Sequence, residues 1–403
     1  MAEIKPLKAW RPKPEIAKDV ACVPYDVVNT QQARDLSKNK PESFLHVIRP
    51  EIDVDEKTSI YDTKVYEQGR KNLAKLLHSD SFIQEEKETV YIYRLIMDGR
   101  SQAGIFSCVS VDEYNDDVIL KHELTRPDKE DDRTKHILTQ EAHAEPVMLT
   151  FRDTGKISDF MEQFMQNNTP LYDFETEDGI SHTIWNIHKP AEIIDEFKKV
   201  AHLYVADGHH RCASASRAAK ELASHNPNHT GHEEYNYFPA VLFPMDQMEI
   251  LAYNRVVYSI PDNFLKTLGN EFQLRKNANP VPSKKGELSL YFDENWYGLT
   301  LKESSKKDPA SQLDVSLLQA QILEPMLEIK DQRTDSNIDF VGGIKGTDEL
   351  EDLVDNGEAS LAFSLYPTSI EELLEVSDAG LLMPPKSTWF EPKLRSGLLV
   401  HTF

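Results

Sequence analysis

Five polar residues, Asp207-Gly208-His209-His210-Arg211, separate an apolar run from a run rich in small residues. Residues 201–206 before them favour a strand, and residues 212–224 after them favour a helix. Gly208 permits a sharp turn and a close backbone approach. The first N–H groups of a helix have no intrahelical partners, and together with the helix dipole they attract anions. The sequence therefore predicts a phosphate site at this loop.

The side chains of the loop favour phosphoryl chemistry. Arg211 offers a forked, permanently charged donor that suits phosphate oxygens. His209 and His210 can donate, accept or attack near neutral pH, and Asp207 is a further catalytic candidate. We expect Arg211→Ala to weaken phosphate binding and to leave the fold intact, because a residue at a helix start lies outside the core. The chain contains no G-x-x-x-x-G-K-[ST] motif, which excludes a P-loop kinase.

Four residues elsewhere in the chain are further site candidates. His122 and Glu123 close a predicted strand, where functional residues of α/β sheets collect. Glu123 could be a general base or could orient His122, and the alternative is a solvated strand end. Arg133 ends a charged run that is either a solvated helix face or turns this arginine inward to a phosphate or carboxylate. Lys393, beside two aromatic residues, could close over an anionic ligand.

Cofactor signals are few. His225, His229 and His232 have a spacing that could suit a metal, but the Asn, Pro, Gly and Thr around them favour a loop. The glycines of residues 340–346 lack the G-x-G-x-x-G order of a dinucleotide fold. We expect a nucleotide (ATP or ADP) with Mg²⁺ as the cofactor, and no flavin, NAD, haem or zinc. The sequence leaves the identity of any protein-bound metal unknown.

Net charge and cysteine usage limit the classes of partner and the compartment that we expect for this protein. The 403 residues carry a formal net charge of −23, which repels nucleic acids and anionic membranes. Cys22, Cys108 and Cys212 form no CxxC pair, and such scattered thiols fit a reducing compartment. No signal peptide or membrane-length apolar run is visible. We expect a cytoplasmic protein whose partner is a small phosphorylated metabolite or a nucleotide, with no membrane or nucleic-acid partner. The sequence leaves the oligomeric state open.

The remaining pattern predicts a mixed α/β (α+β) fold. Two hairpins are expected, one over residues 89–109 with a loop longer than the tightest kind and one over residues 286–301. Helices are expected from apolar residues at helical spacing. They cover residues 59–77, 128–143, 212–224, 315–323, 347–356 and 369–379. A division near residue 260 predicts a phosphate-loop region over 1–260 and a C-terminal α+β lobe over 261–403 that closes on it.

Four segments together resemble the domain of unknown function 1015 family. They are Val23-Pro24-Tyr25-Asp26-Val27-Val28, Lys121-His122-Glu123-Leu124-Thr125, Val205-Ala206-Asp207-Gly208-His209-His210-Arg211 and Trp389-Phe390-Glu391-Pro392-Lys393-Leu394. The third segment also resembles the G-x-x-R or G-C-H-R phosphate loop of the ParB/sulfiredoxin-like superfamily. That superfamily includes nucleotide-gated DNA partition proteins, an ATP-using cysteine sulfinic acid reductase and kinases of free serine. The resemblance implies a ParB/sulfiredoxin-like N-terminal part and a second, smaller α+β lobe.

Position by position, the resemblance makes Gly208 the turn glycine and Arg211 the phosphate arginine. His209 stands where the reductase has its reactive cysteine. Sulfinic acid repair needs a sulfur nucleophile, so the histidine argues against that activity. Since the superfamily includes serine kinases, the resemblance favours phosphoryl transfer on a small hydroxylated metabolite, with free serine or O-phosphoserine as the best substrate and the direction open. A nucleotide-gated regulator or DNA-binding protein and a non-catalytic phosphate-ligand sensor are the alternatives.

Overall fold

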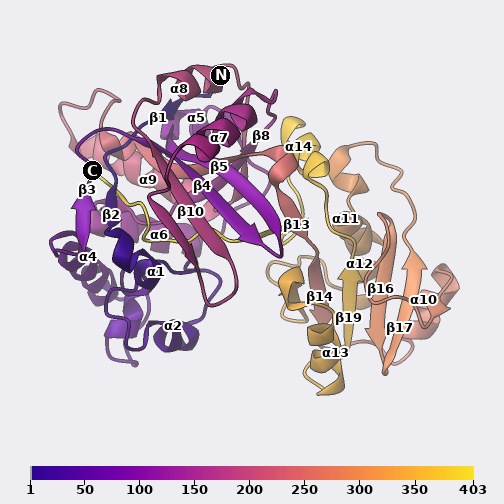
Figure 1. The fold of residues 1–403 in the computed structure, drawn as a ribbon. Coiled ribbons are helices and arrows are strands. Elements are labelled where there is room, and N and C mark those ends of the chain that lie inside the picture. Colours follow the sequence, from indigo (N-terminus) through magenta and orange to yellow (C-terminus); the bar gives the residue numbers. More distant parts are fainter. Residues whose placement is uncertain (1) are drawn as a thin grey trace. The chain divides into compact units, whose positions relative to one another are not determined.

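The computed structural model describes residues 2–403, and Figure 1 shows its fold. The chain forms two units. Unit 1 holds residues 2–121, 125–248 and 392–403, and unit 2 holds residues 122–124 and 249–391. Each unit combines helices with its own main sheet, which confirms the mixed α/β class and the second, smaller α+β part. The boundary near residue 260 stays a prediction.

Unit 1 is built on a nine-stranded mixed sheet in the order β6-β11-β8-β12-β5-β4-β10-β9, with β1 paired to β5. The β6–β11 and β8–β12 pairs are parallel and the others antiparallel. The strands are β1 (Ile4–Lys5), β4 (Val90–Met97), β5 (Arg100–Ser110), β6 (Ile119–Leu120), β8 (Val147–Phe151), β9 (Tyr172–Glu175), β10 (Ser181–Ile187), β11 (Leu203–Asp207) and β12 (Tyr237–Pro244). Two small pairs complete the unit: β2 (Trp10–Pro12) with β3 (Phe82–Gln84), and β7 (Ala142–His143) with β21 (His401–Thr402).

The first hairpin is tighter than the sequence predicts. Met97 of β4 pairs with Arg100 of β5, so the turn contains two residues, Asp98 and Gly99. Both have positive φ, 51° and 78°, as a two-residue turn matched to the twist of the strands requires. Glycine adopts this conformation freely, and Asp tolerates it better than most residues. The prediction of a longer loop was therefore wrong.

Helices of unit 1 pack in two groups. One apolar core joins the sheet to residues of α5, α7, α8 and α9, and a second joins the N-terminal helices around Phe44 and Leu73. In Figure 1 the indigo helices α2 and α4 lie together, apart from α7 and α8. The helices are α1 (Ala17–Val20), α2 (Thr30–Ser37), α3 (Leu45–Ile48), α4 (Thr63–Leu77), α5 (Val111–Asn115), α6 (Pro127–Gln140), α7 (Lys156–Asn167), α8 (Ala191–Phe197) and α9 (His209–His225).

Unit 2 contains a six-stranded sheet in the order β15-β17-β16-β19-β14-β18 and the pair β13–β20. The strands are β13 (Glu249–Leu251), β14 (Tyr253–Val257), β15 (Arg275–Lys276), β16 (Glu287–Phe292), β17 (Asn295–Thr300), β18 (Ile338–Gly342), β19 (Leu361–Leu365) and β20 (Trp389–Glu391). The helices are α10 (Phe264–Glu271), α11 (Asp314–Leu318), α12 (Glu324–Leu327), α13 (Asp348–Asp355) and α14 (Ile370–Asp378). The helix predicted over 315–323 is α11 continued by a π-helical turn, Gln319–Leu323.

Across residues 2–403, no helix has both the length and the apolar character that a membrane span requires.

Candidate functional site

The candidate site is built where β11 passes into α9. Strand β11 ends at Asp207, Gly208 is the residue before the helix, and α9 begins at His209. The helix thus starts three residues earlier than the sequence predicts, so His209, His210 and Arg211 lie in its first turn and not in a loop. Cys212, Ala215 and Ala219 pack this helix into the apolar core of unit 1.

Gly208 is required here by conformation and by space. Its φ of +103° lies in the left-handed region, which side chains rarely adopt. A Cβ at this position would also lie 2.9 Å from Nε of Arg211. The backbone turn and the arginine therefore fit together only with glycine at position 208.

Asp207 is flanked by two cations. Its Oδ2 lies 3.2 Å from Nη2 of Arg211 and 3.6 Å from Nζ of Lys393. Lys393 comes from the C-terminal tail, which belongs to unit 1. The structure thus places Asp207, Gly208, Arg211 and Lys393 together, four of the residues that the sequence selects. Their functional roles remain predictions.

The Arg211 side chain is buried, with 8% of its surface exposed. Besides Asp207, the guanidinium donates from Nη1 to the carbonyl oxygen of Pro146. Burial alone would lower the pKa of Arg211, but the carboxylates of Asp207, Asp26 and Glu145 raise it above its usual value. The premise that Arg211 lies outside the core is therefore wrong, and we now expect Arg211→Ala to destabilise the fold, because the change would leave buried acceptors without a donor.

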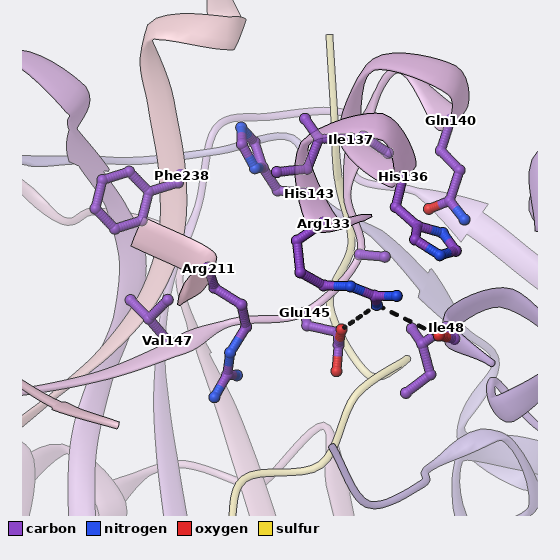
Figure 2. Close-up of a pocket in the computed structure, with 12 residues that line it drawn as sticks. Ile48, Arg133, His136, Ile137, Gln140, His143, Glu145, Val147, Arg211 and Phe238 are labelled. Atoms are coloured by element: carbon purple, nitrogen blue, oxygen red, sulfur yellow. Dashed lines mark hydrogen bonds and ion pairs between the residues drawn. The ribbon is translucent and has the colours of Figure 1, made fainter. Parts of the chain in front are cut away.

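A second arginine approaches the same region from α6. Figure 2 shows the Arg133 side chain reaching Glu145 along a dashed line, with the Arg211 side chain on the other side of Glu145. Nη1 of Arg133 lies 3.7 Å from Oε2 of Glu145, and Nη2 donates to Oδ2 of Asp132 at 2.7 Å. Arg133 thus turns inward to carboxylates, one of the two outcomes that the sequence allows. Burial raises the pKa of Glu145, although Arg211 and Arg133 act to lower it.

This charged cluster borders a cavity of about 40 Å³. Its lining includes Arg133, Glu145 and Arg211 together with His136 and His143. Burial holds the pKa of both histidines well below its usual range, so they are neutral at physiological pH. The buried guanidinium groups of Arg133 and Arg211 are paired with the carboxylates of Asp132, Glu145 and Asp207, so their charges are balanced.

The two loop histidines differ in their surroundings. His209 is buried, with 7% of its surface exposed. Nε2 of His210 accepts a hydrogen bond from the backbone N–H of Arg126 at 3.1 Å, and Arg126 is the residue before α6. His210 thereby ties the start of α9 to the start of α6, so it has an anchoring contact besides its predicted catalytic role.

Two further candidates, His122 and Glu123, follow strand β6 in the chain. Residues 122–124 belong to unit 2, where the carbonyl oxygen of His122 accepts a hydrogen bond from the N–H of Met383 at 2.8 Å. The catalytic role of Glu123 and the ligand-binding role of His122 therefore remain predictions.

The histidines at 225, 229 and 232 have separate environments. Nδ1 of His225 lies 2.9 Å from the carbonyl oxygen of Glu221 within α9. Nδ1 of His229 lies 3.1 Å from Glu233 and 2.9 Å from the hydroxyl of Tyr235. These contacts account for two of the three side chains without a metal.

Sequence reasoning missed two carboxylates near Arg211. Glu145 lies on the short connection between β7 and β8, and its Oε1 accepts a hydrogen bond from the N–H of Tyr25 at 3.0 Å. Asp26 lies in the first family-like segment. The Pro24-Tyr25-Asp26 sequence could have signalled a polar site, whereas nothing local distinguishes Glu145 from a surface residue.

Comparison with known proteins gives a family and distant structural relatives. Residues 4–316 match the family model described as "Protein of unknown function (DUF1015)". No curated protein sequence matches the chain.

Three solved structures illustrate the distant likeness, and each aligns with 73% of this chain. A conserved hypothetical protein from Pyrococcus furiosus is 14% identical, with 94% of that chain covered and a TM-score of 0.38. A free serine kinase in complex with AMP is 13% identical, with 91% covered and a TM-score of 0.37. SbnI with a C-terminal truncation from Staphylococcus aureus is 14% identical, with 87% covered and a TM-score of 0.39. Scores this low do not define corresponding positions, so no residue role is transferred from these structures.

Proposed function

The chain belongs to the DUF1015 family, and we propose that it transfers a phosphoryl group between an adenine nucleotide and a small hydroxylated metabolite. Free serine or O-phosphoserine is the leading substrate. The observation that carries the proposal is the start of α9, where a strand ends at a glycine turn and Lys393 and Arg211 flank Asp207. Phosphoryl transfer depends chiefly on positioning and on neutralisation of charge, and this arrangement supplies both.

We assign the binding roles from burial and contact. The phosphate is bound by the first N–H groups of α9, whose dipole favours an anion. Lys393 adds a positive charge beside them. Arg211 is buried and holds the carbonyl oxygen of Pro146 and Asp207, so it orients the loop and adds to the positive potential.

His209 is the proposed catalytic residue. It lies in the first turn of α9, beside the proposed phosphate position. In one route its imidazole accepts the proton of the substrate hydroxyl as that oxygen attacks the terminal phosphorus of the nucleotide, and the P–O bond to the shortened nucleotide breaks. In the other route the imidazole attacks this phosphorus, the shortened nucleotide leaves, and the phosphohistidine then passes its phosphoryl group to the substrate hydroxyl. The contact of His210 with α6 keeps this turn in place.

Mg²⁺ does not fit Asp207 as a direct ligand. Two cationic side chains already lie within 4 Å of this carboxylate, and a third positive charge there would be repelled. We propose that any Mg²⁺ enters with the nucleotide, bound by its phosphates, and no step here is derived through it. Location in the cytoplasm is proposed because the scattered cysteines fit a reducing compartment.

A turnover screen tests the proposal. Purified full-length protein is incubated with serine plus ATP, ADP or pyrophosphate, and separately with O-phosphoserine alone, while product formation is followed by phosphorus NMR. We expect turnover in at least one mixture and its loss in His209→Ala. Nucleotide binding with no turnover in any mixture would favour the sensor alternative. Tight duplex DNA binding at about 150 mM salt would favour the regulator instead.

A further inference from the structure

Unit 1 contains a second cavity, larger than the one beside Arg211. Its volume is about 150 Å³, and none of residues 207–211 lines it. Its wall includes the buried residues Cys22, Ser43, Leu45 and Arg395. A cavity of this size accommodates several waters or one small metabolite.

Arg395 is a buried cation, and some of its guanidinium N–H groups are available to a ligand. Its side chain is 4% exposed, and it lines the cavity. Nη2 donates to Oγ1 of Thr176 at 3.3 Å and to the carboxylate of Asp178. Within residues 2–403, all side-chain hydrogen bonds of Arg395 run through Nη2, so Nε and Nη1 keep N–H donors for a ligand. Such an edge of a guanidinium matches a carboxylate.

The backbone around Arg395 is held firmly. Its N–H donates to the hydroxyl of Tyr93 at 3.4 Å, and that hydroxyl lies 2.8 Å from Nδ1 of His182. The next residue, Ser396, exchanges backbone hydrogen bonds of 2.9 and 3.2 Å with Cys22. A binding group on a fixed backbone loses little conformational entropy when a ligand arrives, so the cavity is organised in advance.

The charged side chains that line the cavity indicate which charges a ligand should carry. Three basic residues (Lys18, Lys40 and Arg395) face three acidic ones (Asp19, Glu177 and Asp178), so the lining has no net charge. A phosphate dianion would meet three carboxylates and would be disfavoured. A molecule with one negative and one positive group can satisfy Arg395 and still find a carboxylate for its cation.

We propose that this cavity binds a small zwitterionic carboxylate of the α-amino acid class. The ligand carboxylate pairs with Nε and Nη1 of Arg395, its ammonium group faces the acidic residues of the rim, and its side chain lies against Leu45. The proposal concerns binding alone and is independent of the proposed phosphoryl transfer, because it requires no turnover and no nucleotide.

Calorimetric titration of the full-length protein tests the ligand class. The probes are serine, alanine and leucine, with acetate, methylammonium and inorganic phosphate as single-charge comparisons. We expect saturable binding of at least one amino acid, and at least about tenfold weaker binding of acetate and methylammonium. Absence of saturable amino acid binding, or tighter binding of phosphate, would overturn the proposal.

Variants locate the binding. Arg395→Lys keeps the charge and loses the planar edge, so amino acid affinity should fall at least about tenfold. Because Arg395 is buried, Ala21→Phe provides a second variant that fills the cavity from its half-buried wall and should abolish binding. Lys71→Met, exposed on α4, is the control that should bind normally. Normal affinity in a folded Ala21→Phe protein would contradict the assignment.

Cys22 provides a readout inside the cavity. All three cysteines are buried, but only Cys22 lines this cavity. Burial raises the pKa of its thiol, so labelling by a small neutral maleimide should be slow. Bound amino acid should slow it further, by at least about fivefold at tenfold excess over Kd, without changing labelling of Cys108 or Cys212. Equal slowing of all three cysteines would indicate global stabilisation and would overturn the assignment to this cavity.

Discussion

Each unit contains a buried arginine, and the two differ in the partners that surround the guanidinium group and in the direction of the pKa shift. Arg211 of unit 1 lies near Asp207, Asp26 and Glu145, which raise its pKa above the usual value in spite of burial. Arg255 of unit 2 is fully buried, and among the described residues it forms no ion pair. Burial lowers the pKa of Arg255 to about 9.

Uncharged hydrogen-bond acceptors take the place of a carboxylate around the buried guanidinium group of Arg255. Its guanidinium donates to the carbonyl oxygens of Tyr253, Pro385 and Lys386 and to the side chain of Gln332, and it lies over the ring of Phe340. All of these contacts are uncharged groups of the fold. A ligand anion can exchange with a carboxylate, but it cannot replace backbone carbonyls that hold chain segments together. The contacts of Arg255 assign it to the framework, whereas the carboxylates around Arg211 are consistent with the binding site proposed above.

We expect the largest change, a loss of turnover, from substitution of His209. If the start of α9 carries the chemistry, His209→Ala should lower turnover by about 10²–10⁴-fold while nucleotide binding is kept. A nucleophilic role would give a larger loss, with an acid-labile phosphoprotein in the wild type under rapid quench. His209→Gln separates the two roles, because its amide can still donate a hydrogen bond to phosphate but cannot accept the proton or attack phosphorus. Near-normal turnover in both variants would remove His209 from the mechanism and leave Glu123 as the proton-transfer candidate.

The next effect concerns stability and Arg255. Arg255→Met should lower the free energy of unfolding by about 3 kcal/mol, because buried carbonyl acceptors lose their donor. Nucleotide affinity of the folded protein should not change. Urea unfolding of the full-length protein measures this loss, with Arg333→Met as the control, an exposed arginine of unit 2 that should cost less than about 0.5 kcal/mol. Equal losses in the two variants would refute the framework role.

The smallest effect concerns a half-exposed pair that should titrate. The hydrogen bond to Asp53 raises the pKa of His46 above 6.5, against the effect of burial. A raised folded-state pKa stabilises the fold below the unfolded pKa, and this stability is lost as the pH rises through the folded value. His46→Gln should therefore cost about 0.5–1 kcal/mol near pH 5.5 and almost nothing near pH 9, as read by thermal unfolding at each pH. A cost that does not depend on pH would contradict the ion pair.

The sequence predicted those elements whose signals are local. The periodicity of residues 59–77 indicated α4, which the structure places at Thr63–Leu77. The strand–glycine–helix pattern located the start of α9 because each part is a short-range preference. The family resemblance was likewise confirmed, since it depends on motifs and not on packing.

Features that depend on packing between distant segments escaped prediction. Nothing near Glu145 indicates that it meets Arg133 of α6 and approaches Arg211 of α9. The burial of Arg211 could not be read from its place at a helix start, because the contact with Pro146 crosses 65 residues of sequence. Nor could the return of residues 392–403 to unit 1, which brings Lys393 to Asp207, be seen in the chain order.

The most direct test of the central claim is the nucleotide affinity of Arg211→Lys, measured by equilibrium dialysis with labelled ADP. This change keeps a positive charge and loses the fork that holds Asp207 and the carbonyl oxygen of Pro146, so the start of α9 should lose its orientation and bind phosphate more weakly. We predict an affinity at least about tenfold below that of the wild type, with Lys135→Met, an exposed residue of α6, binding normally. Wild-type affinity in a folded Arg211→Lys protein would contradict the assignment of the phosphate to the start of α9.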